Sequence, residues 1–345
     1  MRNTLVGYQT GVNLGGWVSQ FKEATAEHFN TFITEKDIEQ IASWGMDHVR
    51  LPIDYTVIEE ENNPFHYLEE GFGYIDRCIR WCEANQLNII LDLHRTPGYA
   101  FHTLKENRLF EEEALQERFL DIWRTFARRY KDYGRNVMFE LLNEIVEPNS
   151  ERWNKLSQRA IAAIREIDSE RVIIMGGNNY NSVTTLKELD HIEDDNLVYT
   201  FHFYEPHIFT HQKASWEPPM RELRFEVSYP SGTEDYNRYL KQSEVFRRNY
   251  SFEERIGKDY IRKLLQPALE FIRERNVPLY CGEYGVIDLA PMESNIRWHE
   301  DVCDILLEYG IGRAVWNYKL MSFPMVDASS EVRDERLIRI ISRRQ

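Results

Sequence analysis

Cysteine is scarce in this 345-residue sequence, and its four positions fit neither a disulfide framework nor a zinc site. Cys78 and Cys82 lie one turn apart on an expected helix, and no Cys-x-x-Cys pair occurs in the chain. Cys281 lies in an apolar run and Cys303 in a late helical pattern. We therefore expect all four to be buried free thiols.

Positive charge is also in short supply, because 42 Lys and Arg face 57 Asp and Glu, for a net charge of −15. Such a chain repels phosphate backbones, so we expect no nucleic-acid partner, whereas a neutral polymer is indifferent to this charge. No apolar run is long enough to span a bilayer, and residues Met1 to Leu5 do not open a signal peptide. We expect a monomer with no membrane partner, either cytoplasmic or secreted with its leader absent from this sequence.

The sequence also lacks the common motifs for metals and phosphates. No His-Glu-x-x-His pattern and no glycine-rich phosphate loop occurs, and Gly15–Gly16 and Gly176–Gly177 fit tight turns at strand ends. His207 and His211 are four residues apart, but they fall in a long connection where loop hydrogen bonds are the simpler expectation. We expect neither a metal nor a cofactor.

What is present is a regular alternation of short apolar runs and longer helical patterns. The expected strands are Gly7–Leu14, Met46–Leu51, Leu87–Leu93, Val137–Leu142, Val172–Met175, Leu197–Phe201, the segment Pro278–Gly285, and Gly312–Trp316. Strands that are apolar on both faces are typical of a parallel sheet covered by helices. The order predicts one (β/α)8 TIM barrel that spans residues 1–345.

One connection departs from this regularity. The stretch from about Pro206 to Gly257 is far longer than a usual β-to-α connection. It is rich in aromatic residues, namely Phe209, Trp216, Tyr229, Tyr236 and Tyr250. We expect an inserted subdomain between strand six and helix six that forms one wall of a cleft.

Two apolar strands end on a carboxylate. Strand four stops at Asn143 and Glu144, and strand seven stops at Glu283. A carboxylate at the end of a hydrophobic strand is costly to bury without a partner or a task. In a barrel of this kind the site lies at the carboxyl ends of the strands. The polar and aromatic residues at those ends are Arg50, His94, Asn143, Glu144, His202, Tyr204, Glu283 and Trp316.

This ordered set, together with the opening Gly11–Trp17, resembles family 5 of the glycoside hydrolases, the large retaining family of cellulases and mannanases. The resemblance covers essentially the whole chain. Asn178–Ser182, Thr210–Ala214 and Trp316–Lys319 resemble a group of bacterial endoglucanases within that family.

The resemblance assigns catalytic roles to the two carboxylates. It makes Glu144 the general acid/base and Glu283 the nucleophile, which in a retaining enzyme lie about 5–5.5 Å apart. Arg50 is then expected to favour the charged form of Glu283, and Glu283 to raise the pKa of Glu144 by like-charge repulsion. Tyr204 is expected to hydrogen-bond Glu283.

The remaining positions are expected to bind substrate. By the same resemblance Asn143 binds the 2-hydroxyl of the reacting sugar, His94 and His202 shape the same site, and Trp316 forms its stacking floor. Further sugar contacts are possible at Asn13, Trp17, Asn178 and Trp216, while Trp44, Trp81, Trp123, Trp153 and Trp298 fit helix packing. Glu140 lies inside strand four, either as an interior polar group with a partner or as a residue wrongly placed inside.

The leading hypothesis is a retaining endo-β-1,4-glucanase that acts on cellulose-like or mixed-linkage β-glucan. An exo-β-1,3-glucanase and a β-mannanase of the same family are the nearest alternatives. A non-catalytic glycan-binding protein would be expected to lack one of the two carboxylates, and both are present. A metal-dependent barrel enzyme for small acids needs clustered Asp and Glu at the strand ends, where only two Glu are found.

Overall fold

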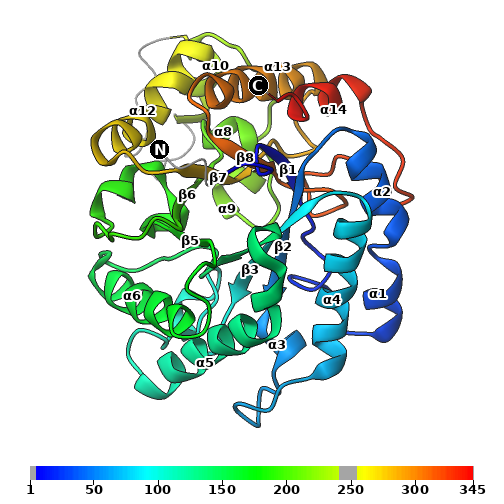
Figure 1. Cartoon of the computed structure of the whole chain (residues 1–345). Helices are drawn as coiled ribbons and strands as arrows, with labels where there is room; N and C mark the ends of the chain where they lie inside the picture. The colour runs from blue at the N-terminus through cyan, green and yellow to red at the C-terminus, as the bar shows by residue number, and fades with distance from the viewer. Residues whose placement is uncertain (1–4, 241–254, 345) are drawn as a thin grey trace.

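The computed structural model describes residues 5–240 and 255–344, so Tyr250 of the expected insertion lies outside the described residues. Eight parallel strands close into one barrel, each strand paired with its neighbours in chain order and β8 with β1 (Figure 1). They are β1 (Thr10–Asn13), β2 (His48–Asp54), β3 (Asn88–Arg95), β4 (Val137–Glu140), β5 (Ile173–Gly176), β6 (Leu197–Phe203), β7 (Leu279–Tyr284) and β8 (Gly312–Val315). The predicted TIM barrel is confirmed.

Helices surround the ring of strands (Figure 1). The long ones are α2 (Glu35–Ser43), α4 (Glu69–Ala84), α5 (Glu113–Tyr130), α6 (Glu151–Arg165), α12 (Lys258–Arg275) and α13 (Met292–Glu308), with α1 (Ala26–Thr31) and α14 (Glu335–Ile341) near the two ends. A capping box starts α2, since the Asp37 carboxylate accepts from the Thr34 amide at 2.7 Å. Shorter segments are α3 (Tyr55–Ile58), η1 (Leu104–Glu106), η2 (Lys131–Asn136), α7 (Asn178–Asn181) and η3 (Val183–Glu188).

The barrel interior changes from apolar to charged along the strands. A small buried cluster, which includes Ile90, Met138 and Val198, fills one end of the interior. Because side chains alternate along a strand, the residues two positions later point the same way, and these are Asp92 and Glu140. Glu140 is therefore an interior group with a partner, as described below.

The described part of the insertion contains short helices that pack on the barrel. They are α8 (His207–Thr210), α9 (Pro218–Arg221) and α10 (Thr233–Leu240). Phe209 and Tyr229 are buried against each other, with ring centroids 5.6 Å apart. The Tyr229 hydroxyl donates to Asp301 of α13 at 2.7 Å, which fixes the insertion to the outer layer.

Several smaller expectations can be checked directly. All four cysteines are free and buried, as predicted. Strand one is shorter than expected, because Gly7 to Gln9 form a turn and a bend before β1 begins at Thr10. None of the helices in the described part of the chain has the length and hydrophobicity needed to cross a lipid bilayer.

Candidate active site

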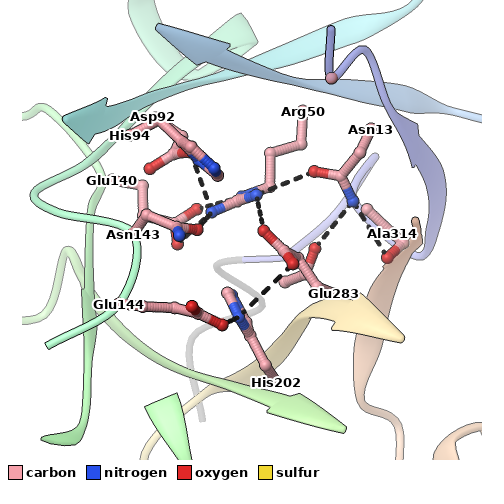
Figure 2. A network of polar contacts seen from close by, with 12 residues as sticks. Asn13, Arg50, Asp92, His94, Glu140, Asn143, Glu144, His202, Glu283 and Ala314 are labelled. Atoms are coloured by element: carbon pink, nitrogen blue, oxygen red, sulfur yellow. Dashed lines mark hydrogen bonds and ion pairs between the residues drawn. The ribbon is translucent and has the colours of Figure 1, made fainter. Parts of the chain in front are cut away.

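The site is arranged around the guanidinium of Arg50, which is fully buried at the centre of the barrel (Figure 2). Its Nε and Nη2 atoms donate to the two carboxylate oxygens of Glu140, at 2.7 and 2.9 Å. Nη2 also lies 3.0 Å from Asp92, and Nη1 lies 2.8 Å from Glu283. Three acids around one arginine keep this cation charged, and the pKa of Arg50 is raised well above its usual range despite its burial.

Asp92 links this cation to the next layer of the site. Its Oδ2 atom lies 2.7 Å from His94 Nδ1, and burial raises the pKa of Asp92 to about 7. Burial lowers the pKa of His94 to about 3, so this imidazole is neutral at physiological pH. The His94 ring stacks on Trp316 with centroids 5.8 Å apart and an interplanar angle of 8°. Gly15 permits this packing, because a Cβ there would meet the Trp316 ring at 2.6 Å.

Glu144 lies directly after β4 and is bonded to the end of β6. His202 Nδ1 lies 2.8 Å from Glu144 Oε1, and both side chains are nearly inaccessible to solvent. Burial raises the pKa of Glu144 to about 7, with a smaller contribution from Glu140. The cause is thus mainly burial, and not mainly the charge of Glu283 that we expected.

Glu283 is aimed into the barrel by an irregularity in β7. The register with β6 pairs Phe201 with Cys281 and then His202 with Glu283, so Gly282 has no partner and forms a bulge. Glu283 Oε1 accepts from Arg50, and its Oε2 accepts from the Tyr204 hydroxyl at 2.9 Å. The predicted contact between Tyr204 and Glu283 is present.

The two carboxylates face each other across His202. One carboxylate oxygen of Glu144, one of Glu283 and one ring nitrogen of His202 all lie within 4.8 Å of one another. His202 Nδ1 is also 3.6 Å from Glu283 Oε2, so this ring nitrogen lies between the two acids (Figure 2). Burial lowers the pKa of His202 to about 4, which makes the imidazole a neutral hydrogen-bonding group. All eight residues predicted from the strand ends thus lie in this site or in direct contact with it.

Asn143 shows how the central arginine orients a neutral side chain. Its Oδ1 atom accepts from Arg50 Nη2 at 2.9 Å, which fixes the orientation of the amide. Nδ2 is then the group that Asn143 can offer as a donor to a ligand.

Three of the four additional sugar-binding candidates are wrong. Asn13 is fully buried, donates to carbonyls of Gly282 and β8, and accepts from Arg50. Asn178 uses both ends of its amide to bind the backbone of Glu147. Trp17 is buried against Trp81, and its indole donates to a helix carbonyl. These residues position the site and cannot reach a ligand.

Trp216 is the fourth candidate and is 54% exposed. Its ring lies 6.2 Å from that of His211 and 6.3 Å from that of Phe323. Both of those rings contact Tyr204, at 5.2 and 5.7 Å. A chain of ring contacts therefore runs from Tyr204, the partner of Glu283, through His211 and the buried Phe323 to the exposed Trp216. His207 is bonded to Glu217 at 2.7 Å, as its loop position predicts.

The structure adds one exposed aromatic residue that sequence reasoning missed. Tyr180 follows β5 and lies within a turn whose residues Asn179, Tyr180 and Asn181 all have positive φ, from 50° to 58°. The turn is bonded to the loop of Glu144, since the Tyr180 amide donates to Ile145 and Asn181 Nδ2 donates to Asn143. Tyr180 is 45% exposed. Its only signal in the sequence is the unusual run of asparagines around it.

A parallel eight-stranded barrel with two facing carboxylates and a neutral histidine at its carboxyl end is typical of barrel glycoside hydrolases. Comparison with known proteins agrees with this class. Residues 8–322 match the model for cellulase (glycosyl hydrolase family 5), and the chain therefore belongs to that family.

Two curated relatives are similar along almost their whole length. Endoglucanase C of Acetivibrio thermocellus is 48% identical over 99% of this chain and 100% of its own. Cellodextrinase A of Ruminococcus flavefaciens is 35% identical over 98% and 94%. Among solved structures, endoglucanase Cel5A of Thermotoga maritima shares the fold, with a TM-score of 0.77, 23% identity and 97% coverage of both chains.

Proposed function

We propose that this protein is a retaining endo-β-1,4-glucanase that hydrolyses internal bonds of cellulose-like or mixed-linkage β-glucan, with Glu144 as acid/base and Glu283 as nucleophile. The observation that carries the mechanism is the contrast between the two carboxylates. Glu144 is bonded to a neutral histidine and has a raised pKa of about 7, whereas Glu283 is paired with the buried Arg50 cation. Environments that differ in this way assign the roles of acid and nucleophile to the two carboxylates.

In the first step Glu283 attacks the anomeric carbon while Glu144 gives its proton to the departing glycosidic oxygen. Arg50 and Tyr204 each hydrogen-bond one oxygen of Glu283 and hold it in line for attack. In the second step Glu144, now ionised, takes a proton from water, which attacks the anomeric carbon and releases the sugar from Glu283. A carboxylate oxygen of Glu144 lies within 4.8 Å of one of Glu283. This distance supports the short separation of a retaining pair of acids and not the separation of about 6.5–9.5 Å of an inverting pair.

The surroundings suit a neutral sugar. Asn143 offers an amide donor close to both acids, and His94 with Trp316 supplies a flat surface beneath the reacting ring. Trp216 adds an exposed ring on the insertion, where a longer chain can stack. We propose that the barrel and insertion work as one catalytic unit on a β-glucan chain, and that the enzyme acts as a monomer.

The substrate class rests on the relatives as well as on the site. Endoglucanase C is similar over the full chain, and this favours internal cleavage of a β-1,4-glucan. The name of cellodextrinase A favours short oligosaccharides as an alternative. A panel of β-glucan, carboxymethylcellulose, laminarin, mannan and cellodextrins separates these candidates from an exo-β-1,3-glucanase and a β-mannanase.

The decisive experiment is product analysis on barley-type β-glucan with the wild type and the variants Glu144→Gln and Glu283→Gln. Each substitution removes one half of the double displacement, so we expect a loss of activity of at least 10³-fold. The wild type should release oligosaccharides with retained anomeric configuration. Inverted products, or undiminished turnover in either variant, would rule out this mechanism.

The alternative hypothesis is a metal ion bound by Glu144, His202 and Glu283. His202 already forms a hydrogen bond with Glu144, and the Arg50 cation lies 2.8 Å from Glu283, where it would repel a divalent ion. We therefore expect hydrolysis to be unaffected by a strong chelator. Loss of activity with the chelator, restored by added metal, would support the metal-dependent reading.

A further inference from the structure

His202 has one ring nitrogen that the proposed mechanism leaves unexplained. Nδ1 lies against Glu144, while Nε2 is buried and has no hydrogen-bond partner among the described residues. The hydroxyl of Thr200 is buried in the same way and also has no partner in that part of the structure. The two residues are two positions apart on β6, so their side chains project from the same face of the strand.

The bulge at Gly282 brings these two atoms to the same small space. A Cβ at Gly282 would lie 3.1 Å from Thr200 Oγ1 and 3.2 Å from His202 Nε2. Any side chain there would crowd both the hydroxyl and the ring. With glycine this space stays open. The two atoms do not bond to each other in the structure, so a side chain has to rotate to form a hydrogen bond across it.

We propose that the Thr200 hydroxyl donates to His202 Nε2 and thereby holds His202 in the tautomer whose Nδ1–H donates to Glu144. Thr200 is then a positioning residue that acts through the histidine. The inference deepens the proposed function, because it states how the acid of that mechanism is prepared for its substrate.

The tautomer matters because a neutral imidazole carries one proton. If the proton is on Nδ1, it donates to Glu144 Oε1, and the acidic proton of Glu144 must then be carried by Oε2. If the proton is on Nε2, then Nδ1 accepts the acidic proton, which is directed at the histidine and away from a leaving group. Only the first form makes Glu144 a ready proton donor.

Thr200 favours the first form because only in that form does every buried donor have an acceptor. When its hydroxyl donates to Nε2, both the hydroxyl proton and Nδ1–H are satisfied. When Nε2–H donates to the hydroxyl instead, the hydroxyl proton has no acceptor in the described structure and is left buried. Buried donors without partners are rarer and costlier than under-used acceptors.

The charged and titratable groups around His202 leave this choice to Thr200. They are Glu140 and Glu144 from the β4 side, Glu283 of β7, Arg50 of β2 and His94 of β3. The contacts recorded to Glu144 and Glu283 are both made by Nδ1. Burial lowers the pKa of His202 to about 4, so the neutral ring persists while Glu144 titrates.

The first test reads the tautomer directly by ¹⁵N NMR of the labelled full-length protein between pH 5 and 8. We expect the His202 signals to show a protonated Nδ1 and an unprotonated Nε2 in the wild type. In Thr200→Val, which has nearly the same shape without the donor, the Nε2–H form should be populated. A wild-type ring protonated at Nε2 would overturn the inference, and this readout does not depend on any activity.

The second test separates steps that need the acid from steps that do not. In Thr200→Val we expect kcat/KM to fall about tenfold on oligosaccharides, whose leaving group needs a proton. It should change by less than twofold on aryl glycosides with a good leaving group. Thr200→Ser keeps the hydroxyl and should restore the oligosaccharide rate. Equal losses on both substrates, or the same loss in Thr200→Ser and Thr200→Val, would contradict a role through the acid.

Gly282→Ala offers a second probe that leaves Thr200 and His202 in place, and it serves if Thr200→Val does not fold. Its methyl group would contact the hydroxyl at 3.1 Å and Nε2 at 3.2 Å, and it would occupy the space that the proposed bond needs. We expect the same selective loss on oligosaccharides and the same tautomer change. A folded Gly282→Ala enzyme with wild-type kinetics and tautomer would refute the inference. If no variant or wild type hydrolyses any glucan, the proposed function fails while the NMR test still stands.

Discussion

Glu144 carries a stability cost that follows from its proposed task. It has to hold a proton near neutral pH, and burial raises its pKa from the usual 4.5 to about 7. Between these two values the folded protein binds more protons at this site than the unfolded chain does. The free energy of unfolding therefore decreases as pH rises through this window. Only below about pH 4.5 is it not reduced by the ionisation of Glu144.

This cost can be measured with Glu144→Gln, whose amide resembles the protonated acid and does not titrate. We expect the variant to gain stability over the wild type as pH rises from 5 to 8, by on the order of 2 kcal/mol at pH 8. Denaturant melts across this range give the difference. Burial also raises the pKa of Asp92, but Asp92 is present in both proteins, so its contribution cancels in the difference between them.

Glu193→Gln, at an exposed position, is the matched control for removing one negative charge. Its stability difference from the wild type should vary much less over the same range. If the difference between Glu144→Gln and the wild type stays constant from pH 5 to 8, Glu144 does not have the raised pKa that the acid role requires.

At the scale of the element, the turn after β5 holds strain beside the acid. Three consecutive non-glycine residues adopt left-handed backbone angles in α7. Asparagine tolerates this region, but tyrosine does so at a cost of about 1–2 kcal/mol. Bonds from Asn178, Tyr180 and Asn181 to the loop of Glu144 maintain the turn. We infer that the strain is retained because it places Tyr180 at the rim next to Glu144.

Tyr180→Gly should therefore stabilise the protein and harm the enzyme. Glycine removes the strain but increases the conformational entropy of the unfolded chain. We therefore expect a net gain in unfolding free energy of about 1 kcal/mol, with lower activity on β-glucan. Thermal unfolding and initial rates measure the two effects. Tyr180→Ala removes the same ring without relieving the strain, so it should lose activity and gain no stability. A glycine variant less stable than the alanine variant would refute stored strain here.

The sequence predicted the elements well where a local signal sufficed. Each barrel strand is an apolar run, and Glu144 and Glu283 were found because such a run stops on a carboxylate. The interior layer was harder. Asp92 and Glu140 are explained only by Arg50, which reaches them from a different strand, and no local pattern reveals that contact. The same holds for Asn178, whose partners lie 31 residues away.

At the scale of the whole molecule, the barrel and the insertion divide the work of binding. Inside the barrel, Arg50 holds Glu283 and His202 holds Glu144, while the insertion carries the exposed Trp216, whose ring is linked to Tyr204 through His211. We therefore propose that buried charge holds the catalytic geometry and that the exposed rings set the chain-length preference. The two can be changed separately.

Trp216→Ala tests this division. We expect KM for long β-glucans and cellohexaose to rise about tenfold, in line with about 1–1.5 kcal/mol for one stacked ring, while kcat/KM on small aryl glycosides stays within twofold. Tyr309→Ala removes an exposed ring beyond the end of α13, at the opposite end of the barrel, and should change neither. Equal losses on long and short substrates would mean that Trp216 supports the fold of the insertion and does not bind the substrate chain.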